Sequence, residues 1–260
     1  HIVSPSQIAE ARRCLRSWWW QSVKGYRKPD TAATLFGGAV HSALETRVLE
    51  GGWPDVVEPE VQYRAQPAFD ALTQELDLNP HRILVEFDWL LPAGHEGYPL
   101  ASRGRIDLVA VDHDTVVDWK TTSSKGWMKT PDVLKTDPQV ILYIDAMLAD
   151  DCVSLPATFL HVYTLTKGAA HAQVVRTVVD EKTLSIGRAA IADTMSRMVE
   201  VLEMDDPQPE QILGNVLACR DFGGCPHYDR CFNNKPTVEE GENMSSFAEQ
   251  LAARRAAQSG

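Results

Sequence analysis

Two short runs in which apolar and polar residues alternate constrain the fold of this chain more than any other segment. They cover residues 104–111 and 115–121, and the turn-forming residues Asp112, His113 and Asp114 separate them. A period of two is typical of a half-buried β-strand, and two such runs joined by a short polar turn predict a β-hairpin. We expect the central sheet of the protein to form around this hairpin.

The pairing register of the hairpin decides which side chains share a face. With a four-residue loop, Val111 pairs with Val116, and counting inward places Asp107 opposite Lys120. Asp118 lies two residues before Lys120, so its side chain leaves the strand on the same side. The other side is expected to face a core and carries Ile106, Leu108, Val117 and Trp119. The hairpin therefore gathers two carboxylates and one ammonium group on one face.

These groups together suit metal-assisted hydrolysis. Mg²⁺ prefers oxygen ligands, which Asp107, Asp118 and the backbone carbonyl of Trp119 could supply. A metal ion held there lowers the pKa of a bound water and offsets charge on a phosphodiester. Lys120 could orient the water and stabilise negative charge in the transition state. The same residues also suit a surface hairpin with an Asp–Lys ion pair, so the hairpin alone does not decide between the two interpretations.

The remaining periodic segments predict a chain of mixed helices and strands. Helices are predicted over residues 4–25, 35–50, 66–78, 139–149 and 180–204, and strands over residues 83–91, 157–165 and 172–179. Gly187 leaves a gap in the apolar stripe of the last helix, where another element could pack closely. The acidic, Ala-rich tail 236–260 is expected to be a surface helix or partly disordered.

Several polar residues in these segments are candidates for the same site. His41 and Glu45 lie one turn apart on a predicted helix, and Glu86 lies on the predicted strand before the hairpin. A lone helical histidine is more often a core residue than a ligand, and Glu86 equally suits a solvated strand face. Gln139 and Tyr143 are four residues apart and share a helix face.

Length and composition limit the function classes. A chain of 260 residues suits one large domain, with or without a small accessory lobe. A net charge of −11 argues against tight passive binding to nucleic acid, but less against an enzyme that concentrates acidic groups at its centre. No run approaches the roughly 18 apolar residues of a membrane span, and no secretory signal is recognisable, so we expect a cytoplasmic protein without a membrane partner.

The cysteines indicate metal or cluster ligation rather than disulfides. The five are Cys14, Cys152, Cys219, Cys225 and Cys231. The last three are spaced six residues apart, without the Cys-x-x-Cys knuckles that zinc sites usually contain, and a Cys-Pro pair better suits an iron–sulfur cluster. The fourth ligand would be Cys14 or Cys152. Zinc with His227 and unliganded thiols remain alternatives.

Taken in order, these motifs resemble those of a known family. The set comprises His41, Glu86, the Gly-Arg-Ile-Asp run 104–107, the Asp-Trp-Lys run 118–120, Gln139 and Tyr143. It resembles the RecB-type branch of the PD-(D/E)XK nuclease superfamily over nearly the whole chain. One early and three late cysteines look like its iron–sulfur subgroup, which includes CRISPR-associated Cas-four-like exonucleases, their phage-borne relatives and AddB-type nuclease domains.

The resemblance implies a restriction-endonuclease-like α/β fold, in which helices flank a central mixed β-sheet. The nuclease domain would cover residues 1–235 and precede the acidic tail 236–260. Within that domain, residues 1–30 and 205–235 would form an iron–sulfur lobe that joins the N- and C-terminal segments.

The resemblance also implies roles for individual residues. The divalent metal, Mg²⁺ or Mn²⁺, would be held by His41, Asp107, Asp118 and the carbonyl of Trp119. Catalytic roles fall to Asp107, Asp118, Lys120 and Glu86, while Gln139 and Tyr143 would contact nucleic acid or order the site. A [4Fe-4S] cluster would be held by Cys14, Cys219, Cys225 and Cys231, leaving Cys152 as a plain thiol. Two departures from the family pattern are an Asp at 118, where many members have Glu, and the even spacing of the late cysteines.

The function that follows is a metal-dependent DNA exonuclease that prefers single strands or free ends, with a structural cluster. It would act in recombination, repair or CRISPR-type end processing, alone or with a helicase or integrase. The first alternative is a DNA-end-binding subunit of a helicase–nuclease or integration complex, with little catalysis of its own. The second is a redox or zinc protein whose cysteine lobe is the functional centre.

Overall fold

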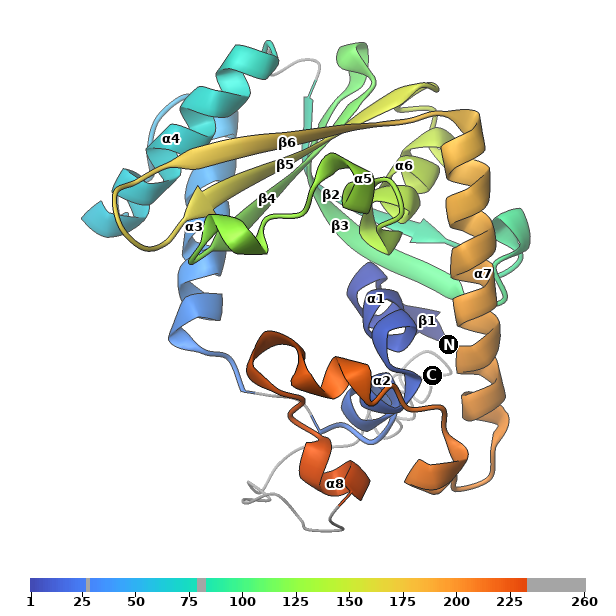
Figure 1. Cartoon of the computed structure of the whole chain (residues 1–260). Coiled ribbons are helices and arrows are strands. Elements are labelled where there is room, and N and C mark those ends of the chain that lie inside the picture. Colours follow the sequence, from blue (N-terminus) through green and yellow to red (C-terminus); the bar gives the residue numbers. More distant parts are fainter. Residues whose placement is uncertain (27–28, 79–82, 233–260) are drawn as a thin grey trace, which may run out of the picture. The chain divides into compact units, whose positions relative to one another are not determined.

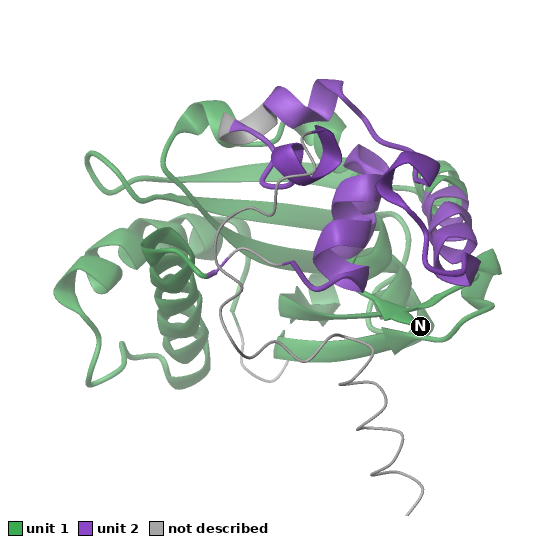
Figure 2. Ribbon diagram, turned by 90° about the horizontal axis from the view of Figure 1, so that it is seen from below, with its two compact units in different colours: residues 1–5, 30–190 green, residues 6–29, 191–260 purple. Residues whose placement is uncertain are grey.

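The computed structural model describes residues 1–26, 29–78 and 83–232, which divide into two units (Figure 2). Unit 1 consists of residues 1–5 and 30–190, and unit 2 of residues 6–29 and 191–260. The predicted tail 236–260 lies outside the described residues. In the described part of the chain, no helix combines the length and the apolar character that crossing a membrane requires.

Unit 1 contains a six-stranded mixed sheet, which confirms the predicted central sheet (Figure 1). Its strands are β1 Ile2–Val3, β2 Ile83–Leu91, β3 Ala101–Ala110, β4 Thr115–Thr122, β5 Ala157–Leu165 and β6 Ala172–Val179. The order is β1-β3-β4-β5-β6, and β2 also pairs with β3. β1 is parallel to β3 and β4 is parallel to β5, whereas the other neighbouring pairs are antiparallel.

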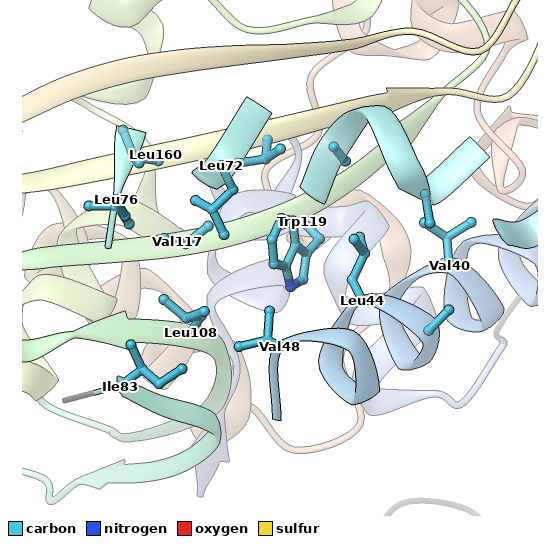
Figure 3. Packing of buried hydrophobic residues seen from close by; sticks show 14 of the residues in the cluster. Val40, Leu44, Val48, Leu72, Leu76, Ile83, Leu108, Val117, Trp119 and Leu160 are labelled. Atoms are coloured by element: carbon cyan, nitrogen blue, oxygen red, sulfur yellow. The ribbon is translucent and has the colours of Figure 1, made fainter. Parts of the chain in front are cut away.

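Two helices cover one face of this sheet. They are α3, Ala32–Glu50, and α4, Pro59–Glu75. α3 begins with Thr31 accepting a hydrogen bond from the Thr34 amide and ends at Gly51 in the left-handed conformation. The core beneath these helices includes Val40, Leu44, Leu72, Leu108, Val117, Trp119 and Leu160 (Figure 3). Leu108, Val117 and Trp119 thus point into a core as predicted, and Ile106 is also buried.

The opposite face carries α6, Pro138–Ala149, which connects the parallel strands β4 and β5. Asp137 caps it by accepting a hydrogen bond of 2.9 Å from the Gln139 amide. Tyr143 of α6 packs against Phe159 of β5. Phe159 directly precedes Leu160 on this strand, so its side chain lies on the face opposite the one that α3 and α4 cover. Short segments η4 Lys125–Trp127 and α5 Pro131–Leu134 lead from β4 into this helix.

Helix α7, Glu181–Glu203, begins in unit 1 and continues into unit 2. Its first turn is capped by Asp180, which accepts a 2.8 Å hydrogen bond from the Thr183 amide. Gly187 contacts α6 as closely as the predicted gap suggested, because an added Cβ there would lie 2.5 Å from Ile141. Helix α6 and the first part of α7 therefore pack together at a position that has no side chain.

The hairpin register differs from the prediction by two residues. Val111 enters a 3₁₀ turn, Val111–His113, and Asp114 takes a left-handed conformation with φ of 47°, so the ladder closes at Ala110 and Thr115. Leu108 is consequently aligned with Val117 and the ladder ends there, so the predicted pairing of Asp107 with Lys120 does not form. Because side chains alternate with a period of two, a shift of two residues preserves the predicted faces and changes only the partners.

Other boundaries also differ. The predicted first helix is broken at Cys14, which is extended with φ of −161°, into α1 Pro5–Arg13, α2 Leu15–Trp18 and a π-helical turn, Trp19–Val23. α4 begins seven residues before the predicted 66. Strand β2 does not alternate throughout, because Glu86 has φ of 51° and interrupts it. Ile83 therefore packs under α3 and α4, while Trp89 packs against Tyr143 of α6.

Unit 2 joins the N-terminal helices to segments from the C-terminal third of the chain. The latter include the 3₁₀ segments Pro209–Gln211 and Leu217–Gly223 and the helix α8, Tyr228–Phe232. The Arg16 guanidinium donates two hydrogen bonds to the Ile212 carbonyl, and Arg13 donates to the Ala218 carbonyl. Trp18 and Trp19 are buried in this unit.

Candidate active site

Strand β3 has two different partners along one edge, and the gap between them creates the site. β2 pairs with one edge of β3 along nearly its whole length. On the opposite edge of β3, β1 pairs with Ala101 and Ser102, and β4 pairs with residues 108–110. Between them, the described strands leave residues 103–107 unpaired on that edge. The Asp107 carboxylate compensates by accepting a 2.6 Å hydrogen bond from the Trp119 amide. We call this place, where β4 separates from β3, the fork.

Tyr143 and Gln139 of α6 support the fork from one side of the sheet. The Tyr143 hydroxyl donates a 2.7 Å hydrogen bond to the carbonyl of Arg105, which lies in the unpaired stretch of β3. Gln139 donates from Nε2 to Tyr143 Oη at 2.9 Å and to Asp118 Oδ1 at 2.6 Å. Burial, followed by the nearby Asp118 charge, raises the pKa of Tyr143, so its hydroxyl remains a donor.

Asp118 is buried, with only 2% of its surface exposed, and its second oxygen has two more partners. Lys120 Nζ lies 2.6 Å from Oδ2, and His161 Nε2 lies 3.1 Å from the same oxygen. Burial alone would raise the pKa of Asp118, but the Lys120 ammonium more than offsets this effect and holds the pKa below its usual value. Likewise, Asp118 outweighs the desolvation of Lys120 and raises its pKa. Both groups are therefore charged at neutral pH.

A recess of about 580 Å³ opens on the α3 side of the fork. His41 and Glu45 of α3 line it, together with Asp107 and Lys120 of the hairpin. His41 Nδ1 lies 3.6 Å from Asp107 Oδ2, and the imidazole is partly exposed, so it is not a core histidine. Gly37 brings the helix close to the hairpin, because a Cβ at this position would lie 2.9 Å from Thr121 Oγ1.

Glu86 also lines this recess, and it belongs to a small network of charges. Arg105 pairs with Glu86 at 3.0 Å and with Asp88 at 2.8 Å. Burial and then the neighbouring Glu86 charge raise the pKa of Glu45. The acidic residues of the recess thus repel one another, which is the arrangement that a bound cation would stabilise.

The predicted site residues are therefore divided between two places that share the fork. His41, Glu86, Asp107 and Lys120 meet in the recess, whereas Asp118, Gln139 and Tyr143 form a buried hydrogen-bonded network on the α6 side. Trp119 contributes its amide to Asp107, and its side chain belongs to the core. Lys120 is the residue common to both, since it lines the recess and contacts Asp118.

The predicted metal ligands His41, Asp107 and Asp118 are not assembled around one point. Among the described residues, no three His, Cys, Asp or Glu side chains lie close enough together to hold a metal ion. The donor chemistry nevertheless fits, because imidazole and carboxylate groups of a partly open acidic recess are suitable ligands for Mg²⁺ or Mn²⁺. Such an ion would also relieve the mutual repulsion of the recess carboxylates.

Sequence reasoning did not identify His161 and Tyr163 as part of this region. His161 of β5 is aligned with Asp118 of β4 in the parallel pair, and Tyr163 is aligned with Lys120. The only available signal was the alternation of polar His161 and Tyr163 with apolar Leu160 and Val162 along the strand. This pattern does not identify the neighbouring strand, so it could not show that His161 meets Asp118.

The late cysteines and Cys14 gather within unit 2. The Asn215 amide donates to Cys14 Sγ at 3.4 Å, while the Asn215 carbonyl accepts from Cys219 Sγ at 3.7 Å. Burial, followed by the charges of Cys225, Cys14 and Cys231, raises the pKa of the Cys219 thiol. In the described part of the chain, however, no three of these thiols lie close enough together to hold a metal ion. Cys152 belongs to unit 1, where its thiol donates to the Asp150 carbonyl.

Asp107 and Lys120 line an acidic recess and Lys120 contacts Asp118, and such a set of carboxylates and a cation suits metal-assisted hydrolysis. The chain belongs to the PD-(D/E)XK nuclease superfamily, whose family model matches residues 2–232. Nucleases of this superfamily generally use Mg²⁺ or Mn²⁺.

A comparison with solved structures gives the same fold. The chain is similar to a protein from Eubacterium rectale that bears the name "Putative exonuclease", with a TM-score of 0.55 and 12% sequence identity. The match covers 97% of this chain and 93% of the other. At this level of identity the likeness concerns the fold. A search of curated proteins gave no significant match.

Proposed function

We propose that the protein is a metal-dependent deoxyribonuclease that shortens DNA from free ends and prefers single strands. The observation that supports this best is the position of Lys120, which contacts buried Asp118 and also reaches the recess that holds Asp107 and His41. The recess of about 580 Å³ is in the size range of sites for small ligands, so it can accommodate a short stretch of one strand. The fold that the chain shares with the Eubacterium rectale protein is consistent with end trimming.

The chain's own groups have distinct roles in this proposal. His41, Asp107 and Asp118, with the Trp119 carbonyl, would hold Mg²⁺ or Mn²⁺, which supplies an acidified water and charge neutralisation at the phosphate. Glu86 supports this acidic set from the wall of the recess. The Tyr143 hydroxyl and the Gln139 side-chain amide already make hydrogen bonds to Arg105 and Asp118. Their main role is therefore to orient Asp118 and the fork.

Lys120 acts as a fixed cation and not as a base. Its raised pKa keeps the ammonium charged at neutral pH, so it cannot remove a proton from water. An ammonium at the edge of the recess can instead stabilise the extra negative charge that develops on a phosphodiester during attack. Replacement of Lys120 by a neutral residue therefore removes stabilisation of the transition state.

The decisive experiment is a gel assay with linear single-stranded and double-stranded DNA labelled at either end, and with circular DNA as the substrate without ends. Each substrate is incubated with Mg²⁺, Mn²⁺ or a chelator. We expect progressive metal-dependent shortening of linear DNA, and a rate about 100-fold or more lower for Lys120→Ala. Lys182→Ala, an exposed change at the start of α7, serves as the matched lysine control and should retain full activity.

The outcomes separate the candidate functions. Cleavage that is independent of metal, or equal in Lys120→Ala and wild type, contradicts the proposed mechanism. Cutting of circular DNA would replace the exonuclease with an endonuclease. DNA-end binding without cleavage would favour the alternative of a binding subunit that works with a helicase or integrase.

We further propose that Cys14, Cys219, Cys225 and Cys231 hold a [4Fe-4S] cluster that stabilises unit 2. The support is that the four cysteines belong to one unit and that Arg13 and Arg16 lie near some of them, although the thiols are not assembled around one point among the described residues. Burial raises the pKa of Cys231, while the Trp20 indole and the Arg16 guanidinium act in the opposite direction and favour the thiolate that ligation requires. Both groups can donate hydrogen bonds to a ligating sulfur.

Analysis of anaerobically purified protein tests the cluster. We expect about four iron and four sulfide ions per chain and a broad absorption near about 400 nm. Cys225→Ser should lose most of the iron, whereas Cys152→Ser should retain it because Cys152 belongs to unit 1. One zinc ion without sulfide would support the zinc alternative, and full iron content in Cys225→Ser would overturn the ligand assignment.

A further inference from the structure

The loop after β4 carries Trp127, which has no role in the reaction proposed above. Trp127 is 57% exposed, whereas the rest of the seven tryptophans are buried or partly buried. We propose that this loop, residues 123–129, is a binding site for single-stranded DNA, in which Trp127 stacks on an unpaired base and Lys125 contacts the phosphates. The inference rests on the proposed nuclease function for the identity of its ligand, and it adds a subsite to that function. We call this segment the Trp127 loop.

The Trp127 loop begins next to the recess. Thr121 of β4 lines the recess, and its hydroxyl lies against Gly37 of α3. Trp127 follows Thr121 by six residues, which span at most about 20 Å even in an extended chain. The 3₁₀ turn η4, Lys125–Trp127, shortens this path. A strand whose end lies in the recess therefore needs only a few nucleotides to reach the indole.

Hydrogen bonds hold the Trp127 loop at both ends. The Thr122 carbonyl accepts from the Thr166 amide at 2.8 Å, and the Thr122 hydroxyl donates to the Ser124 carbonyl at 3.1 Å. Ser124 also caps the 3₁₀ turn with its side chain. At the far end, the Lys129 amide donates a 3.0 Å hydrogen bond to the Tyr163 hydroxyl. An exposed ring on a fixed backbone loses little conformational entropy when a base stacks on it.

The charge of the segment around Trp127 is opposite to that of the whole chain. The net charge of the chain is −11, but residues 119–131 include Lys120, Lys125 and Lys129 and no acidic residue. Lys129 forms an ion pair with Asp137, whereas Lys125 is exposed two residues before Trp127. A local basic segment of this kind attracts the phosphate backbone of DNA to the edge of the recess.

The combination of these features distinguishes Trp127 from an ordinary exposed residue. Single apolar side chains on a protein surface need no functional explanation. Here the exposed ring lies on a fixed loop, between lysines and close to the recess. Aromatic rings and basic groups together are the usual elements of sites for single-stranded nucleic acid. Stacking requires an unpaired base, so this subsite would account for a preference for single strands.

Binding can be measured apart from cleavage, by fluorescence anisotropy of a labelled single-stranded oligonucleotide with a chelator present. We expect Trp127→Leu to raise Kd about 5- to 100-fold, and Trp127→Phe to retain most of the affinity because it keeps an aromatic face. Lys125→Ala should weaken binding and reduce the slope of log K against log salt by about 0.7. The matched controls Tyr63→Leu, at an aromatic residue of α4 that is 53% exposed, and Lys182→Ala should bind as the wild type does.

An abasic site identifies the stacked base directly. The site is moved one nucleotide at a time from the end of the oligonucleotide, and each substrate is titrated with wild type and Trp127→Leu. In the wild type, one or two adjacent abasic positions should weaken binding, and the same positions should have no further effect in Trp127→Leu. Equal losses in both proteins at every position would show that the indole contacts no base, which overturns the inference.

Steady-state kinetics on cleaved DNA provide a second measurement. Trp127→Leu should raise KM for single-stranded DNA with little change in kcat, and should have a smaller effect on duplex DNA, whose bases are paired. A lower kcat with an unchanged KM would refute the binding role. If the wild type binds DNA with the expected abasic pattern but does not cleave it, the proposed nuclease function fails and the subsite stands. Cleavage without that pattern rejects the subsite alone.

Discussion

The contact between Asp118 and Lys120 determines the electrostatics of the fork. A buried carboxylate is costly unless a cation or several hydrogen-bond donors compensate it, and here a lysine, a glutamine and a histidine converge on it. The lowered pKa of Asp118 and the raised pKa of Lys120 show that the pair favours the charged form of both members. The contact that places Lys120 for its proposed catalytic role therefore also contributes to folding.

This leads to a prediction for stability. In Lys120→Ala, Asp118 loses its cation while it stays buried, so its pKa should rise above that of an unfolded chain. Stability from a group with a raised pKa is present at low pH and is lost as the pH increases through that pKa. We expect a loss of about 2–3 kcal/mol at neutral pH and a smaller loss at acidic pH.

Urea unfolding of wild type, Lys120→Ala and Lys182→Ala at several pH values, with a chelator present, measures this effect. Lys182→Ala should behave as the wild type throughout. A loss in Lys120→Ala that does not change with pH, or that increases toward acidic pH, would contradict the role assigned to this pair.

At the level of single residues, much of the site could be predicted. Alternation around Asp107, Asp118 and Lys120 was sufficient to put them near one another, because a register error of two residues preserves the faces. The partner of Asp107 was wrong, since the 3₁₀ turn at Val111 is decided by backbone conformations that the residue types do not specify uniquely. His161 was missed because strand neighbours that are distant in sequence leave no local pattern.

Among the secondary-structure elements, the hairpin could be predicted but the fork could not. The divergence of β4 from β3 depends on β1, a strand of two residues, occupying the edge that β4 leaves. No periodicity is detectable in so short a strand. The left-handed conformation of Glu86, which interrupts the alternation of β2, is likewise not detectable in the sequence.

Packing of α7 against α6 leads to a second prediction on stability. Ala favours a helix over Gly by about 1 kcal/mol, but a Cβ at Gly187 would lie 2.5 Å from the side chain of buried Ile141. The clash should outweigh the helical preference, and Gly187→Ala is expected to destabilise the protein by about 1–2 kcal/mol. Gly38→Ala is the matched control, since nothing lies within 4 Å of a Cβ at that helical position.

A double-mutant cycle with Ile141→Ala identifies the cause. Chemical denaturation should show that the double variant loses less stability than the sum of the two single variants, because the new methyl group occupies part of the space vacated by Ile141. Additive losses, or a Gly187→Ala variant as stable as Gly38→Ala, would show that this contact does not limit the packing of the two helices.

For the whole molecule, the division into two units places the candidate chemistry and the cysteines in separate parts of the chain. Unit 1 contains every residue of the fork and the recess, whereas Cys14 and the three late cysteines belong to unit 2. The sequence predicted four related cysteines, but the break that turns Cys14 out of the first helix was missed. An extended residue inside a good helical pattern follows from tertiary contacts, here those of Arg13, Arg16 and Asn215.

At the fork, residues from the two sides of the sheet contribute separately to the candidate site. Residues of α3 line the recess, whereas Gln139 of α6 and His161 of β5 contact Asp118 from the other side of the sheet. Substitutions on α3 at positions other than His41 can therefore change the shape of the recess without disturbing the contacts of Asp118. A nuclease built in this way can vary its recess through one helix, while another helix keeps the buried carboxylate in place.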